Sequence, residues 1–198
     1  RDLLQVLCSG ASATVSGDRW RHELDRVLDE TRPCQALVRA VELGVLAGIH
    51  PSLTRSDAVA VISRSPNTSP NLYLAGLVYS LSSAQGEEVI GRLRLPKQRA
   101  KLVRDTNSLR ESQRTLMDSI AIASKLGTLL DRMDLDAVRA NAILAEDRNV
   151  RQGLKWYISK LRNVAALLTG DDLLAMGVVQ GTEVGEVLGR LLDARLDG

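Results

Sequence analysis

The stretch that most constrains the fold of this chain is its C-terminal end, residues 168–198, where glycines punctuate apolar residues in a pattern typical of helices. Thr169 or Asp171 can cap a first short helix, because their side chains accept hydrogen bonds from free backbone N–H groups. Gly177 suits the left-handed position that ends such a helix. Apolar residues then recur at helical spacing after Thr182. The pattern predicts two helices joined by a glycine-bounded turn.

The rest of the sequence also favours packed helices. Leu, Val and Ala dominate, Phe is absent and aromatic residues make up 3% of the chain, which is poor material for β-sandwiches or barrels. We therefore predict an all-α fold. Besides a helix end at Arg1–Cys8, helices are predicted after the N-cap Ser16, from Pro33 to Gly44, over Leu72–Leu81 and Gly86–Leu93, from Pro96, and over Leu116–Leu130, Leu135–Ala145 and Val150–Leu161.

Net charge, cysteine spacing and hydropathy bear on whether the chain binds nucleic acid, holds zinc or spans a membrane. A net charge of +2 is too small to indicate nucleic-acid binding by itself. Cys8 and Cys34 lack metal-ligand spacing, so we expect no zinc site and a reduced, cytoplasmic setting. No apolar run reaches the roughly 20 residues of a membrane helix, and no membrane is expected as a partner. The chain starts at Arg1 in mid-pattern, so we interpret it as a piece of a longer protein.

Two motifs resemble one enzyme family. The C-terminal pattern T-G-D-D-L-x-x-M-G-x-x-x-G-x-x-x-G-x-x-L, ending in L-D-G, resembles the signature of bacterial class II tRNA nucleotidyltransferases (CCA-adding enzymes) and their poly(A) polymerase relatives. Near the other end, V-S-G-D-R-x-x-x-E-L and the later E-L-G-V-L-A-G-I-H-P-S-L are similar to their neck-to-body region. Family members usually carry prolines around the second glycine, where this chain has Gln180 and Thr182.

The resemblance implies a multi-helical neck, body and tail array from which the N-terminal catalytic head is missing. On this basis residues 1–53 form a neck remnant and RNA-binding helical subdomain, residues 54–132 a body domain and residues 133–198 a tail domain. In the family these helices hold the acceptor stem and TΨC arm of tRNA. The parent protein would add CCA, or part of it, to tRNA 3′ ends, and this fragment alone is not expected to be catalytic. A bacterial poly(A) polymerase remains an alternative parent.

The most basic stretch of the chain is the candidate track for tRNA phosphates. Without the resemblance, a solvated charged face is the usual meaning of such a run. Its candidate RNA-binding residues are Arg92, Arg94, Lys97, Arg99, Lys101 and Arg104.

Three further groups are candidates. Lys155 and Lys160 flank two aromatic residues at positions 156 and 157, which can stack on RNA or belong to the core. The turn from Gly177 to Gly181 can offer N–H groups to a phosphate. Arg19 and Glu23 are the charged pair of the neck motif and, at i and i+4, can also bridge within one helix.

The chemistry of the family's head is absent from this sequence. The resemblance implies Mg²⁺ held by paired carboxylates, and CTP or ATP, in the missing head, with no cofactor in this fragment. Asp134 and Asp136 have D-x-D spacing but sit at a predicted helix start, and no H-D dipeptide exists. A helical interaction module that forms a homodimer is a further alternative, and it would use the C-terminal leucines Leu188, Leu192 and Leu196.

Overall fold

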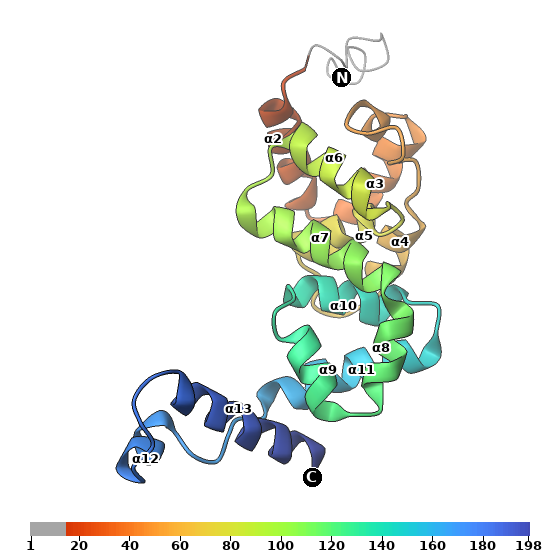
Figure 1. Ribbon diagram of the computed structural model, residues 1–198. Coiled ribbons are helices and arrows are strands. Elements are labelled where there is room, and N and C mark those ends of the chain that lie inside the picture. The colour runs from red at the N-terminus through yellow and green to blue at the C-terminus, as the bar shows by residue number, and fades with distance from the viewer. Residues whose placement is uncertain (1–14) are drawn as a thin grey trace.

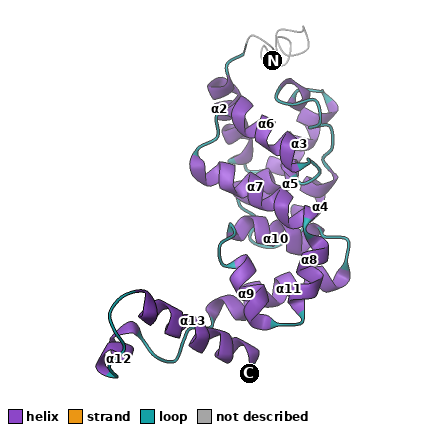
Figure 2. Ribbon diagram, in the orientation of Figure 1, coloured by secondary structure: helices purple, strands orange, loops and turns teal. Residues whose placement is uncertain are grey.

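The computed structural model describes residues 15–198, so the helix end predicted at Arg1–Cys8 lies outside the described part. Within this range the chain forms twelve α-helices and two short 3-10 helices, and no strand (Figure 2). The all-α prediction is confirmed. None of the helices in this range is both long and apolar enough to cross a membrane.

The helices form an elongated stack with a protruding C-terminal tail (Figure 1). The upper part of the stack contains α2 (Gly17–Leu28), α3 (Pro33–Glu42), η2 (Leu46–Gly48), α4 (Asp57–Ile62), α5 (Pro70–Val78), α6 (Ser83–Leu93) and α7 (Lys97–Glu111). The lower part contains α8 (Gln113–Ile120), α9 (Ala123–Leu130), α10 (Leu135–Leu144), α11 (Arg148–Ser159) and η3 (Leu161–Asn163). The tail consists of α12 (Gly170–Ala175) and α13 (Thr182–Asp197).

Helix α5 is the centre of the upper part. Every residue from Leu72 to Val78 is buried, which confirms the buried helix predicted from its continuous apolar run. Around it α2 contributes Trp20 and Leu24 to the same hydrophobic cluster. An amphipathic helix contributes one stripe to such a core, whereas α5 is enclosed by its neighbours and is apolar all round.

Helix α10 contributes residues to the hydrophobic clusters of both halves of the stack. Its residues Ala137 and Ala140 belong to the upper cluster, while Val138 and Ala142 belong to the lower cluster formed with α8, α9 and α11. The small alanine side chains allow neighbouring helices to approach on two sides. The predicted division of the chain after residues 53 and 132 stays a prediction.

Local capping fixes several predicted helix starts. The Ser16 side chain accepts from the backbone N–H of Arg19 at the start of α2. Asp134 accepts from the N–H groups of residues 136 and 137 at the start of α10, which confirms its predicted role as a cap. Thr169 and Asp172 form a reciprocal capping box at the start of α12. Polar side chains thus satisfy N–H groups that a helix start leaves open.

Two predicted boundaries are wrong. The helix predicted over Leu116–Leu130 is broken, because Ile122 adopts an extended conformation between α8 and α9. The break lets Leu116 and Leu126 both reach full burial in the lower cluster. Helix α4 was not predicted, and α6 begins at Ser83 rather than Gly86 because Ser82 forms a capping box with Gln85.

The glycine of the V-S-G-D-R motif lies at a close contact between helices. A Cβ atom on Gly17 would lie 2.1 Å from the backbone carbonyl oxygen of Arg92, at the end of α6. Asp18 and Arg94 form an ion pair across the same junction at 3.0 Å. Glycine is therefore required at position 17 of the motif for a structural reason, since any side chain would prevent α2 and α6 from approaching this closely.

Candidate nucleic-acid interface

The basic stretch at the end of α6 and the start of α7 is largely neutralised by carboxylates from other elements. Arg94 ends α6 in a left-handed conformation and pairs with Asp18 of α2. Arg99 forms an ion pair with Asp25 of the same helix. Both carboxylates lie more than 70 residues away in the sequence. Two of the predicted phosphate-binding cations thus already have partners within the fold.

The next turns of α7 are paired as well. Lys101 lies 2.5 Å from Asp105 and also donates to the backbone carbonyl of Arg132. Arg104 donates to both carboxylate oxygens of Glu87, at 2.5 and 2.8 Å. These hydrogen bonds from Arg104 lower the pKa of Glu87. A phosphate that approached this face would have to compete with bound carboxylates.

The remaining members of the stretch differ from each other. Lys97 is exposed and makes no ion pair among residues 15–198. Arg92 is half-buried, and its carbonyl faces Gly17 at the α2–α6 contact. The prediction that this stretch binds RNA stays a prediction, with Lys97 as its most available cation.

Helix α11 presents cations and an exposed aromatic side chain together. Lys155 and Lys160 are exposed and make no ion pair with the described part of the chain. Trp156 between them is 40% exposed, whereas Tyr157 is 3% exposed and donates its hydroxyl hydrogen bond to Asp131 at 2.8 Å. Of the two aromatics, one therefore belongs to the core and one is available for stacking.

A groove beside α9 adds cations that the sequence analysis did not identify. Lys125 and Arg132 lie two helical turns apart, are exposed and have side chains without ion pairs in residues 15–198. They line a groove of about 640 Å³ together with Ser119, Thr128 and Asp193, the last from α13. Their i, i+7 spacing in the sequence, which is typical of one helix face, was a usable signal.

The glycine turn of the tail offers fewer free N–H groups than predicted. Gly177 has a φ of 91°, and its N–H donates to the carbonyl of Leu174. The N–H of Val178 donates to Leu173, so the end of α12 uses both groups. Gly181 has a φ of 139° and begins α13 without a side-chain cap. Within the described chain its N–H has no hydrogen-bond partner, which leaves this side of the turn open to an acceptor.

The tail exposes large apolar side chains. Leu167, Met176 and Val179 are 78, 71 and 69% exposed. The C-terminal leucines that an interaction module would use, and that were therefore expected to be exposed, are half-buried: Leu188, Leu192 and Leu196. Of the three, Leu196 packs against the lower cluster.

The charged pair of the neck motif does not bridge within its helix. Glu23 pairs with Arg26 at 3.4 Å. Arg19 is exposed on the surface of α2 and makes no ion pair with residues 15–198. Its guanidinium is therefore available to a partner.

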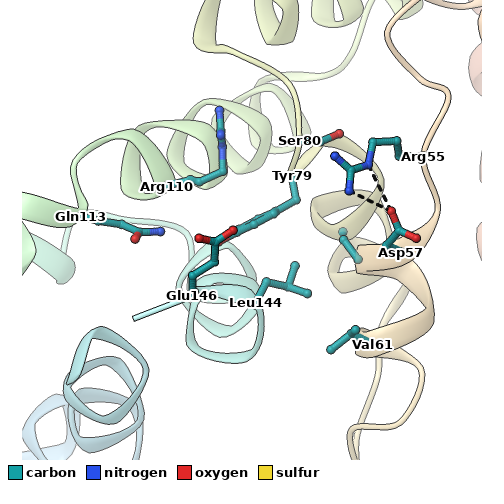
Figure 3. A pocket seen from close by; sticks show the side chains of 11 residues that line it. Arg55, Asp57, Val61, Tyr79, Ser80, Arg110, Gln113, Leu144 and Glu146 are labelled. Carbon is teal, nitrogen blue, oxygen red and sulfur yellow. Dashed lines mark hydrogen bonds and ion pairs between the residues drawn. The ribbon is translucent and has the colours of Figure 1, made fainter. Parts of the chain in front are cut away.

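A cavity of about 520 Å³ lies between α4, α5, α7 and the end of α10 (Figure 3). Arg55 and Asp57 pair at its rim, and Tyr79, Arg110 and Glu146 surround its interior. Burial raises the pKa of Tyr79, the nearby Arg110 lowers it and Glu146 raises it, so this phenol stays protonated at neutral pH. The two arginines and the two carboxylates that line the cavity balance in charge.

Carboxylates do not form a metal centre in the described part of the chain, where no three His, Cys, Asp or Glu side chains converge. Asp134 is engaged by backbone N–H groups, and Asp136 pairs with Arg139 at 3.1 Å. His50 is buried, accepts from the backbone N–H of Ser52 through Nδ1 and donates to Glu88 from Nε2 at 2.7 Å. Both ring nitrogens of His50 thus have partners within the fold.

The fold is the helical array found in CCA-adding enzymes. A structure titled Thermotoga maritima CCA-adding enzyme complexed with tRNA(CCA) matches with a TM-score of 0.69 and 19% identity, covering 99% of this chain and 51% of that chain. A CCA-adding enzyme with ATP matches with a TM-score of 0.70 and 20% identity, covering 99% of this chain and 50% of the other. The chain spans about half the length of these structures.

Among individual proteins, the A-adding tRNA nucleotidyltransferase of Geobacter sulfurreducens is 40% identical over 58 residues, which is 28% of this chain and 7% of that protein. No family model matches the chain. The resemblance to tRNA nucleotidyltransferases is thus confirmed in the fold along nearly the whole chain and in the sequence of one segment.

Proposed function

We propose that this chain is the tRNA-binding C-terminal region of a tRNA nucleotidyltransferase, working in the cytoplasm. It positions the acceptor stem and TΨC arm while a catalytic head of the parent protein binds Mg²⁺ and CTP or ATP and adds CCA or part of it. Support comes from the match of nearly the whole chain to an enzyme whose structure is complexed with tRNA.

One observation of the surface carries the RNA-binding part of the proposal. Cations without ion pairs lie on α9 (Lys125) and on or just after α11 (Lys155 and Lys160), whereas those of α7 are mostly paired. Lys125, Lys155 and Lys160 can therefore neutralise phosphates without first giving up a carboxylate. The exposed Trp156 adds a face on which a base or ribose can rest. Such contacts recognise A-form shape more than sequence.

Binding of the 198-residue chain to a tRNA acceptor–TΨC minihelix tests the proposal. A plain RNA hairpin of equal length is the comparison, at low and moderate salt. The chain is expected to prefer the minihelix and to lose affinity steeply as salt rises, with a logarithmic slope of about −0.9 for each phosphate neutralised. Equal and weak binding to both RNAs would contradict the proposal.

Two charge-matched triple variants then locate the contacts. K97A/K101A/R104A removes cations of α7, and K125A/K155A/K160A removes cations of α9 and α11. Each removes three positive charges, so a difference between them reports contacts rather than net charge. Because α7 is internally paired, the second triple should flatten the salt slope more. A larger effect of the first triple would restore the α7 track as the main RNA-binding surface.

Two alternatives keep specific support. A poly(A) polymerase parent would share this helical region. Sequencing the products of the full-length enzyme separates the two parents, since a CCA-adding enzyme stops at CCA and a poly(A) polymerase continues.

A protein-interaction or homodimerisation module is favoured by the exposed Leu167, Met176 and Val179. If these three exposed side chains mediate self-association, light scattering over a range of concentrations should show a dimer.

A further inference from the structure

Helix α9 begins without a local cap and is capped instead by the other end of the chain. Its N-cap residue, Ile122, has no side chain that can accept a hydrogen bond. Asp197, the last residue of α13, fills this role. Its carboxylate accepts from the backbone N–H of Ser124 at 2.8 Å and from the Ser124 hydroxyl at 2.7 Å. A carboxylate at a helix N-terminus satisfies an open donor and complements the helix dipole.

This contact belongs to a short set at the end of α13. Leu196 packs against the lower cluster, and its Cδ1 lies 3.4 Å from the position that a Cβ atom on Gly127 would take. Arg195 donates to the backbone carbonyl of Ala165 at 2.5 Å. We call the contacts of Arg195, Leu196 and Asp197 the C-terminal latch. They involve Leu196 and Asp197, the L-D of the L-D-G ending.

The rest of α13 is held weakly. None of its residues is buried, and positions 185 and 189, both glycines, have open space where a Cβ would point. The tail leaves the stack through residues 164–169 and returns to it at the latch (Figure 1). Helix α13 has 16 residues, so at 1.5 Å per residue the Gly177–Gly181 turn lies about 24 Å from the latch along the helix axis. A small rotation at the latch therefore moves the turn by several ångströms.

We propose that Asp197 is a positioning residue: by capping α9 it fixes the angle of the tail on the stack, and so sets the length of RNA that the chain accepts. The second half of this statement rests on the proposed function. The first half is a property of the chain alone. A base-paired RNA that contacts both Lys125 on α9 and the glycine turn has to match the distance between them, and the latch determines that distance.

A distance measurement on the chain without RNA tests the first half. Spin labels are placed on M117C in α8 and M176C beside α12, two exposed methionines, in a background with C8S and C34S. Asp197→Ala removes the latch carboxylate. Asp193→Ala is the matched control, since Asp193 lies on the same helix, carries the same charge and makes no ion pair or hydrogen bond in residues 15–198.

We expect one narrow distance distribution for the parent chain and for D193A, and a broad, shifted distribution for D197A. An unchanged, narrow distribution in D197A would overturn the proposal. Circular dichroism of both variants verifies that the helices are intact, as expected for substitutions of exposed side chains.

Minihelices lengthened or shortened by one base pair test the second half. The parent chain should discriminate among lengths, whereas D197A should lose this discrimination, because its tail is no longer held at one angle. Retained length discrimination in D197A would overturn the assignment. If the parent chain itself does not prefer the minihelix over the hairpin, the proposed function fails, and the spin-label distances still decide whether the latch positions the tail.

Discussion

Substitution of Gly17 by Ala tests the close contact between α2 and α6. The added methyl group would lie 2.1 Å from the carbonyl oxygen of Arg92 and 3.2 Å from its carbonyl carbon. Both atoms belong to the backbone and cannot rotate away, so the two helices have to separate by about an ångström. Overpacking of this kind costs about 1–3 kcal/mol.

The residues around this contact indicate that the loss in stability lies toward the upper end of this range of about 1–3 kcal/mol. Trp20 and Leu93, on the two helices, are 4 and 0% exposed, so separation would loosen a filled core. The side chain of Arg21 donates to the carbonyl of Arg94 at 2.8 Å across the same junction. We therefore expect G17A to lower the free energy of unfolding by about 2–3 kcal/mol.

Urea unfolding followed by the fluorescence of the buried Trp20, in a background with Trp156→Phe, measures this loss. With a denaturant slope of about 2–3 kcal/mol per molar, the midpoint should fall by about 1 M. Gly91→Ala is the matched control, because Gly91 lies within α6 and has open space where the methyl group would point. That variant should be more stable by about 0.5–1 kcal/mol. A midpoint for G17A equal to that of the parent chain would refute the argument.

Further substitutions probe the lower cluster. Tyr157→Phe removes the hydrogen bond to Asp131 and should lower the free energy of unfolding by about 1 kcal/mol in thermal melts. Burial and that hydrogen bond raise the pKa of Tyr157 above 10.0, its ordinary value. The unfolded chain therefore releases this proton at lower pH than the folded chain, and the free energy of unfolding should fall as pH rises past 10.0. The Phe variant should lose this part of the pH dependence. Gly153→Ala places a methyl group 2.6 Å from Cγ1 of Ile120 and should cost about 1–3 kcal/mol, and trimming Ile120 to Ala in the same chain should make the loss less than additive.

Local features of the fold could be predicted from the sequence. Caps at Ser16, Asp134 and Thr169 depend on a side chain and an N–H group two or three residues away, so the sequence contains the whole interaction. The burial of α5 followed from its unbroken apolar run. The break at Ile122 could not be predicted in this way, because it depends on how two helices share the lower cluster.

The charge state of the candidate site could not be predicted, for a similar reason. Along the sequence, the stretch that ends at Arg104 contains many cations and no carboxylate of its own. In the fold, α2 and the first half of α6 bring Asp18, Asp25 and Glu87 to it. A count of charge in a sequence window omits partners that arrive from distant segments, and it therefore overstates the positive charge that this stretch offers to a phosphate.

The two-sided burial of α10 has a consequence for hydrogen exchange. Since Ala137 and Ala140 face one cluster and Val138 and Ala142 the other, its amide groups become accessible to solvent only when both clusters have opened. Deuterium should therefore enter α10 last, while α13, with no buried residue, should exchange early. Labelling detected by mass spectrometry would then show a slow middle between a moderately protected upper half and a fast C-terminus, and α10 would be the segment that joins the two halves into one cooperative unit.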